Sequence, residues 1–167
     1  MTINDFNSQS KENAFKEVFN CCGSTSWANH IVSKRPFLTV EELKLVSDQI
    51  WKNSSIENIL EAFTHHPKIG DKKSVEKKFT STSNWASNEQ SGVDKAENSI
   101  LEELAKGNLE YENKFGFIFI VCATGKTAEE MLKLLNKRLP NSIDEEIRIA
   151  AGEQNKITHL RIDKLFI

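Results

Sequence analysis

Polar and apolar positions follow a helical period along most of the chain, and side-chain caps mark where several helices begin. Thr39–Glu42 and Thr127–Glu130 each place a glutamate three positions after a hydroxyl residue, which is the pattern of a capping box. Ser54–Glu57 and Ser142–Glu145 repeat it. Apolar residues at helical spacing follow each box. The pattern therefore predicts a helix after each of these four starts, and Pro140 should end the third.

Two further stretches complete the fold prediction. Residues 91–116 carry a helical pattern in which Gly107 is the weak point. Phe115–Ala123, "FGFIFIVCA", is the one strand-like run, but a single strand would have no partner in the chain. We expect it to be a buried, partly extended lead-in to the next helix. The expected loops are residues 23–27 and 68–84. The sequence thus predicts an all-α fold, a single-domain bundle of about seven or eight helices over residues 1–167.

Composition narrows the class of protein. The chain has 167 residues with 22 basic and 24 acidic side chains, and a nucleic-acid binder would show a basic excess. No apolar run approaches the roughly 20 residues of a membrane helix, and the N-terminus has no signal pattern. We therefore expect a cytoplasmic protein with neither nucleic-acid nor membrane partners. The cysteines Cys21, Cys22 and Cys122 are odd in number, which favours reduced thiols, with Cys122 in the core.

The first candidate for chemistry is the stretch "FTHHPKIGD", where two histidines and a proline end a helical pattern. A histidine at such a helix break could serve packing, metal binding or acid–base catalysis. Metal binding needs several ligands at suitable spacing, and no such motif surrounds His65 and His66, so we expect no metal site. "ATGKT" at 123–127 lacks the earlier glycine of a phosphate-binding loop, since Ile120 stands there, and is better explained as a capped helix start.

Two weaker candidates lie further along the chain. Glu89 and Gln90 are neighbours in "NWASNEQSG", which by itself is typical of a surface helix turn. Arg161 in "HLRIDKL" lies on the predicted last helix, where a lone arginine is usually a surface charge. Neither motif alone indicates a function.

Taken together, these motifs resemble the OHCU decarboxylase family of urate degradation. The resemblance rests on His66–Pro67 in "HHPKIGD", on Glu89–Gln90 in "SNEQSGV", and on two long segments, Lys114–Leu132 and Arg138–Leu165. It covers nearly the whole chain in the same order. It implies an all-α, usually homodimeric carboxy-lyase of purine catabolism that uses no metal or organic cofactor. The implied substrate is a small-molecule ureide, 2-oxo-4-hydroxy-4-carboxy-5-ureidoimidazoline, and the implied products are (S)-allantoin and carbon dioxide.

The resemblance also implies roles for individual residues. His66 would be the catalytic imidazole, and Glu89 and Arg161 would share its site. The resemblance further implies that Pro67 and Gln90 help to bind the substrate and that the segment around Val121 forms a wall of the pocket. An imidazole can take and give a proton near neutral pH, and a guanidinium suits a carboxylate or a ring oxygen. Whether His66 would act as base or as acid stays open.

One position departs from the family pattern. The family often has a serine three residues before the glutamate, where this chain has Ala86, and Ser87 follows one position later. Either a hydroxyl contact to the substrate is lost or Ser87 supplies it. Two alternatives therefore stay open: a related enzyme that acts on another ureide, and a non-enzymatic helical interaction module in which His66, Glu89 and Arg161 are scattered surface residues.

Overall fold

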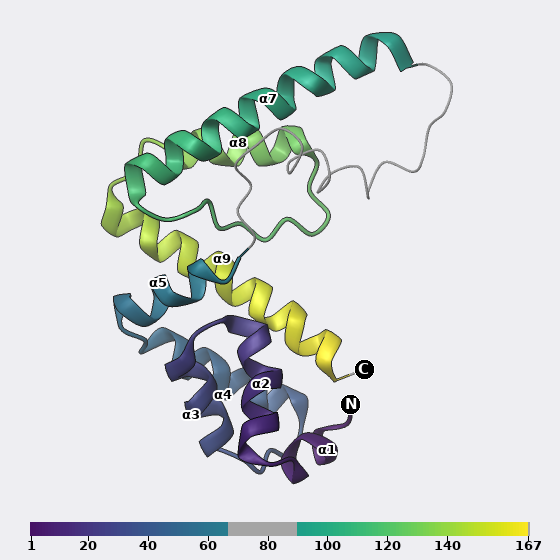
Figure 1. The fold of residues 1–167 in the computed structure, drawn as a ribbon, viewed down its shortest axis with the longest axis vertical. Helices are drawn as coiled ribbons and strands as arrows, with labels where there is room; N and C mark the ends of the chain where they lie inside the picture. Colours follow the sequence, from purple (N-terminus) through teal and green to yellow (C-terminus); the bar gives the residue numbers. More distant parts are fainter. Residues whose placement is uncertain (67–89, 167) are drawn as a thin grey trace. The chain divides into compact units, whose positions relative to one another are not determined.

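The described part of the chain is entirely helical apart from its connections. The structure, a computed structural model, describes residues 1–66 and 90–166, and for residues 90–97 it describes the backbone alone. Eight α-helices lie in these residues, and no strand does (Figure 1). They are α1 (Ile3–Ser8), α2 (Lys11–Cys22), α3 (Thr25–Ser33), α4 (Val40–Lys52), α5 (Ile56–Thr64), α7 (Gln90–Phe115), α8 (Ala128–Arg138) and α9 (Ile143–Leu165). The all-α prediction and its helix count are confirmed for the described residues.

The chain divides into two compact units. Unit 1 contains Met1–His66 and Ile149–Ile167, and unit 2 contains Pro67–Arg148. Helix α9 begins in unit 2 and ends in unit 1. That residues 1–167 form a single domain stays a prediction. The predicted loop at 68–84 lies outside the described residues.

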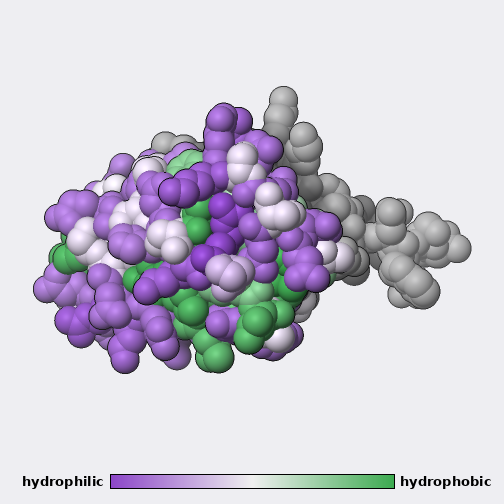
Figure 2. Space-filling model, turned by 90° about the horizontal axis from the view of Figure 1, so that it is seen from below, coloured by the Kyte–Doolittle hydropathy of each residue, from purple (hydrophilic) through white to green (hydrophobic). Residues whose placement is uncertain are grey.

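One face of the molecule is mainly polar (Figure 2). Figure 2 shows a face that is mostly hydrophilic, with hydrophobic residues gathered on part of it. In unit 1, Leu38 is 85% exposed and Leu45 is 65% exposed. Among the helices that the structure describes, none combines the length and the apolar character that crossing a bilayer requires.

The predicted helix starts agree closely with the observed caps. The Thr39 hydroxyl accepts the Glu42 N–H at 3.1 Å, and the Ser142 hydroxyl accepts the Glu145 N–H at 3.3 Å. Thr127 and Glu130 form a complete capping box at the start of α8, and this helix ends before Pro140. Each cap satisfies an N–H group that the first helical turn leaves without an intrahelical partner.

Two local predictions were wrong by a few residues. Helix α5 is capped by Ser55, whose hydroxyl accepts the Asn58 N–H at 3.4 Å, and not by Ser54. Ser54 instead donates to the Ile50 carbonyl at the end of α4. The loop predicted at 23–27 is shorter, because Ser24 caps α3 and thereby places Trp27 inside that helix and in the core.

The core of unit 1 forms where α3 packs against α2, α4 and α5. Its largest fully buried apolar side chains are those of Phe6, Trp27, Ile31, Leu43, Phe63 and Ile162. Ile162 extends this core to α9. Burying one such side chain contributes about 1.5–3 kcal/mol, so these contacts supply the main stabilisation of unit 1.

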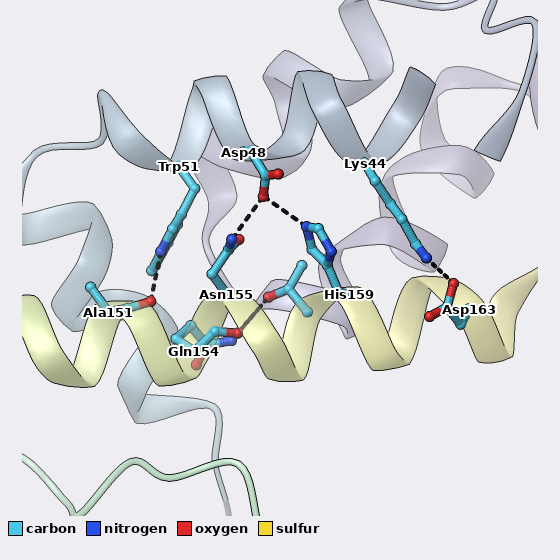
Figure 3. Close-up of polar contacts among 9 residues, drawn as sticks. Lys44, Asp48, Trp51, Ala151, Gln154, Asn155, His159 and Asp163 are labelled. Carbon is cyan, nitrogen blue, oxygen red and sulfur yellow. Dashed lines mark hydrogen bonds and ion pairs between the residues drawn. The ribbon is translucent and has the colours of Figure 1, made fainter. Parts of the chain in front are cut away.

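Polar contacts join α9 to α4 within unit 1. Trp51 Nε1 donates to the Ala151 carbonyl at 2.9 Å. Asp48 Oδ1 accepts from Asn155 Nδ2 and from His159 Nε2, each at 2.7 Å (Figure 3). One turn further on, Lys44 and Asp163 form an ion pair. This face of α9 is therefore held to α4 by directional contacts.

In unit 2 the strand-like run is extended and mostly buried, as predicted. Residues 118–123 are neither helix nor strand, and Phe117, Ile120 and Val121 are buried. Cys122 is half-buried, so its placement in the core was wrong: the buried positions of this segment are Phe117, Ile120 and Val121. Gly107 interrupts nothing in α7.

Gly107 in fact permits a close helix contact. A Cβ at this position would lie 2.5 Å from Leu135 Cδ2, so the missing side chain lets α7 approach α8. The expected weak point is a packing position, and tertiary contact outweighs the low helix propensity of glycine.

A buried ion pair organises unit 2. Arg138 Nε donates to Glu146 Oε1 at 2.6 Å, and Arg138 Nη1 donates to the Ile120 carbonyl at 2.7 Å. Tyr111 donates its hydroxyl to the same carboxylate, and Asn141 Nδ2 donates to Glu146 Oε2 at 2.8 Å. Glu146 is fully buried. The network thus ties α7, α8, α9 and the extended segment together.

Glu146→Gln should destabilise the protein by about 3–5 kcal/mol, because it leaves the buried Arg138 guanidinium without its countercharge. Urea unfolding followed by circular dichroism would measure this as a lower midpoint. The matched control is Glu129→Gln, which breaks the exposed pair with Lys133 and should barely move the midpoint. Equal midpoints for both variants would contradict this explanation of the network.

Candidate functional site

The two histidines after α5 have separate structural roles. His65 is the C-cap of α5, and its ring packs edge-on against Phe19 with centroids 4.8 Å apart. Gly23 makes room for it, since a Cβ there would lie 2.7 Å from His65 Cβ. Gly23 also has a φ of +83°, which favours glycine. His65 is therefore a packing residue against the end of α2.

His66 contacts another element. Its backbone N–H donates to the Phe63 carbonyl at 3.3 Å, and its side chain is half-buried. Its ring nitrogen Nε2 is hydrogen-bonded to Gln154 Oε1 on α9. Among the described residues, the histidine next to the proline has a buried polar partner.

Gln154 is fully buried, and both the nitrogen and the oxygen of its side-chain amide make hydrogen bonds. Gln154 Nε2 donates to the Cys22 carbonyl and to Thr158 Oγ1, each at 3.3 Å. Thr158 in turn donates its hydroxyl to the Gln154 carbonyl at 3.0 Å. Sequence reasoning assigned no role to Gln154, although its side chain is hydrogen-bonded to the candidate imidazole.

Arg161 lies two turns further along α9. Its Nη1 donates to the Asn20 and Cys21 carbonyls, each at 3.3 Å, and the side chain is half-buried. The last carbonyls of a helix have no intrahelical partner and carry partial negative charge. Arg161 thus caps α2 with a cation. Among the described residues, its Nε and Nη2 make no hydrogen bond.

His66 and Arg161 therefore share one support. The last three residues of α2 supply the carbonyls that anchor Gln154 and Arg161, and Gln154 holds His66. Arg161 follows Gln154 by seven positions, which is about 10.5 Å along one face of a helix. The structure thus brings residues from α2, the end of α5 and α9 to the same place within unit 1.

The other predicted site residues fall elsewhere. Val121 is buried in the extended segment of unit 2. Gln90 is the first residue of α7, but its side chain lies outside the description. The predicted residues that lie outside the described ranges are Pro67, Ala86, Ser87 and Glu89. That all of them converge on His66 stays a prediction.

The neighbouring thiols of Cys21 and Cys22 are poor nucleophiles. Burial raises the pKa of both Cys21 and Cys22 to about 12, and the Arg161 charge offsets only part of this effect. The three cysteines form no disulfide. A thiolate is the reactive form of cysteine, so neither Cys21 nor Cys22 is suited to act as a nucleophile near neutral pH.

The buried residues of α9 recur every four positions, and this spacing could have identified Gln154 as buried. The buried positions of this helix are Glu146, Ala150, Gln154, Thr158 and Ile162, and three of these five are polar. Gln154 and Thr158 thus belong to the same row as Ala150 and Ile162. A hydrophobic pattern identifies the core face of a helix by its apolar residues, so it does not detect polar residues that are buried on the same face. Figure 3 shows Asn155 and His159 on the α4 side of α9 and Gln154 away from them.

The fold and the site together define a class: an all-α protein that holds an imidazole and a guanidinium at the C-terminal end of one helix. Residues 7–163 match the model of the OHCU decarboxylase family. Since this match covers nearly the whole sequence, the chain belongs to that family.

Individual relatives agree with this assignment. The uric acid degradation bifunctional protein TTL of Arabidopsis thaliana is 41% identical over 147 residues, which are 87% of this chain and 45% of that protein. The chain therefore spans less than half of the bifunctional relative. The 2-oxo-4-hydroxy-4-carboxy-5-ureidoimidazoline decarboxylase of Xenopus laevis is 33% identical over 175 aligned positions, covering 100% of this chain and 95% of that one. A crystal structure of OHCU decarboxylase in the presence of (S)-allantoin is 38% identical, with a TM-score of 0.72 and coverage of 95% and 99%.

Cys21 and Cys22 should react with a chromogenic aromatic disulfide at alkaline pH roughly a thousandfold more slowly in the folded protein than in urea. A pKa of about 12, against an ordinary 9.0, leaves about that much less thiolate. The Cys122→Ser background isolates these two thiols. Equal rates in the folded and the denatured protein would contradict the burial of either thiol.

Proposed function

We propose that this protein decarboxylates 2-oxo-4-hydroxy-4-carboxy-5-ureidoimidazoline to (S)-allantoin in urate degradation, as a carboxy-lyase that needs no cofactor. The observation that carries the proposal is the family match over residues 7–163. The anchored pair His66 and Arg161 supports it, because the two side chains would supply a proton-transfer group and a cation, and both are held through carbonyls at the end of α2.

The reaction can proceed on the substrate's own electrons. One ring carbon bears the carboxylate and a hydroxyl, and the neighbouring carbon, which bears the ureido group, belongs to a C=N bond. Breaking the bond to the carboxylate releases carbon dioxide and leaves its electron pair on the ring. The C=N group absorbs that pair, and its nitrogen takes a proton, which gives an enol. Loss of the hydroxyl proton and protonation of the ureido-bearing carbon on one face then give allantoin.

His66 is proposed to move a proton in this sequence. It could take the hydroxyl proton or deliver the proton that sets the stereocentre, and both steps need an imidazole near its ordinary pKa range. Its backbone is fixed at the end of α5 and its ring is fixed by Gln154. A fixed ring favours delivery to a single face, which a stereospecific product requires.

Arg161 is proposed to orient the substrate. Its Nη1 is committed to α2, whereas its Nε and Nη2 have no hydrogen-bond partner among the described residues. Two such donors in a planar fork match the two oxygens of a carboxylate. The anchoring by α2 also limits the side-chain entropy that binding would otherwise cost.

The remaining assignments are proposals from the family pattern. Glu89 would accept hydrogen bonds from the ureido N–H groups or orient His66, and Gln90 would meet the ureide edge with one donor and one acceptor. The other proposed substrate contacts are Pro67, Val121, and either Ala86 or Ser87. If the Ala86 departure changes specificity, a panel of related ureides would show preferential turnover of another substrate.

We also propose a homodimer in the cytoplasm. Leu38 and Leu45 expose large apolar side chains in unit 1, which favours a protein partner, and cysteines without disulfides suit a reducing compartment. Light scattering after size exclusion should give twice the 19.0 kDa of one chain, and fractionation should find the protein in the cytosol. A mass of one chain at micromolar concentration would contradict the dimer.

His66→Ala should abolish stereospecific product formation. The substrate is made fresh from urate with urate oxidase and hydroxyisourate hydrolase, and circular dichroism follows the allantoin that forms. Wild type should give a rapid, lasting signal of the S enantiomer. Loss of the general acid–base group should slow this by roughly 10²–10⁴-fold.

The matched control is His30→Ala, which removes an exposed histidine bonded to the Ser26 carbonyl on α3. It should keep wild-type turnover. If His66→Ala also turns over like wild type, His66 is not the catalytic imidazole. If wild type itself only equals the enzyme-free racemic background, the proposed activity is wrong.

Arg161→Ala should raise KM by roughly 10–100-fold, because a charge-assisted contact to the substrate carboxylate contributes about 1.5–3 kcal/mol. Initial rates over a range of substrate concentrations would measure it. Arg148→Ala, at an exposed position of the same helix, is the control and should leave KM unchanged. An unchanged KM in Arg161→Ala, with far-UV circular dichroism like wild type, would remove Arg161 from the binding site.

A further inference from the structure

We infer that Gln154 is a positioning residue that holds His66 in the tautomer with its proton on Nε2, so that Nδ1 is the nitrogen that exchanges a proton with the substrate. The tautomer follows from the contacts of the folded protein alone. Its catalytic consequence rests on the proposed function, because it concerns the proton that His66 moves during decarboxylation.

The orientation of the Gln154 amide is determined by its other partners. The Cys22 carbonyl can only accept, so it must face the amide nitrogen. Thr158 donates its own hydroxyl hydrogen to the Gln154 backbone carbonyl, so its oxygen is left to accept the second amide N–H. Turning the amide over would place Gln154 Oε1 against the Cys22 carbonyl, which has no hydrogen to donate, and this contact would be lost. The atom that faces His66 is therefore an oxygen.

An oxygen at this place determines which ring nitrogen carries the proton. Gln154 Oε1 can only accept, so His66 Nε2 must donate to it. In a neutral imidazole with a proton on Nε2, the lone pair lies on Nδ1. The opposite tautomer would set a lone pair against the amide oxygen. Because Gln154 is fully buried, such a mismatch would disfavour that tautomer roughly ten- to a hundredfold.

The arrangement suits a group that must both take and give a proton. When Nδ1 takes a proton, Nε2 keeps its own, and the bond to Gln154 persists through the whole cycle. The amide has no charge to gain or lose, so it orients the ring without competing for the proton. Gln154 is thus a positioning residue that acts through His66 rather than on the substrate.

The test is the tautomer of His66 in the wild-type protein, measured by long-range ¹H–¹⁵N correlation spectra at a pH where the ring is neutral. The chain has four histidines, and the His66→Ala spectrum identifies the His66 signals. We expect a protonated-nitrogen shift at Nε2 and an unprotonated-nitrogen shift at Nδ1. A proton on Nδ1 of the neutral ring would overturn the inference, whatever the activity of the enzyme.

A variant tests the role of Gln154 itself. Gln154→Met keeps the length of the side chain and removes the acceptor. We expect a mixture of tautomers and a kcat lower by roughly ten- to a hundredfold with little change in KM. Asn155→Leu, the next residue on α9 and bonded to Asp48 instead, is the control and should keep both the tautomer and kcat. Wild-type tautomer and kcat in Gln154→Met would overturn the positioning role.

These experiments distinguish a failure of the proposed decarboxylase function from a failure of the tautomer inference. If wild type shows the expected tautomer but no decarboxylation, the proposed function fails and the Gln154–His66 arrangement stands. If decarboxylation is rapid but the neutral ring is protonated on Nδ1, only the inference fails. Should Gln154→Met not fold, the wild-type tautomer still decides the inference.

Discussion

The side-chain amide of Gln154 is the contact on which the site depends. It joins the last carbonyl of α2, a threonine one turn away on α9, and the imidazole that follows α5. These elements are far apart in the sequence, and apolar packing between them would not by itself be directional. A buried amide contributes to stability only when its donors and acceptor are matched, so the three partners fix one another. The position of His66 is consequently a property of the unit 1 core, not of the loop that carries it.

The same principle explains why buried polar residues recur along α9. Helices and extended segments end with carbonyl groups that have no partner in their own backbone, and burial makes each one costly. In unit 2, Arg138 donates to the Ile120 carbonyl of the extended segment while paired with Glu146. In unit 1, Gln154 and Arg161 donate to the end of α2. The row of buried residues spaced by four on α9 thus contains Gln154, which donates to the Cys22 carbonyl, and Ile162, which packs in the hydrophobic core.

How far the sequence could predict this structure depended on the range of the interaction involved. Capping patterns act within one turn, so the starts of α4, α8 and α9 were predicted, and Ser54 was displaced by one residue because Ser55 offered the same chemistry. Trp27 and Cys122 were misplaced because their burial depends on tertiary contacts. The helix break marked His65 and His66 as candidates, but only the family motif selected His66 and Arg161. Gln154 was missed because its role depends on partners 132 and 88 positions away.

The choice of an amide at position 154 has a chemical reason. A glutamate there could accept from His66 but could not donate to the Cys22 carbonyl or to Thr158, and its charge would be buried. It would also favour the imidazolium and so oppose the return of the proton to a substrate. An apolar residue would leave the end of α2 unsatisfied and the imidazole without orientation. Only a neutral group with two donors and one acceptor satisfies the fold and leaves a ring nitrogen of His66 able to change its protonation during a reaction.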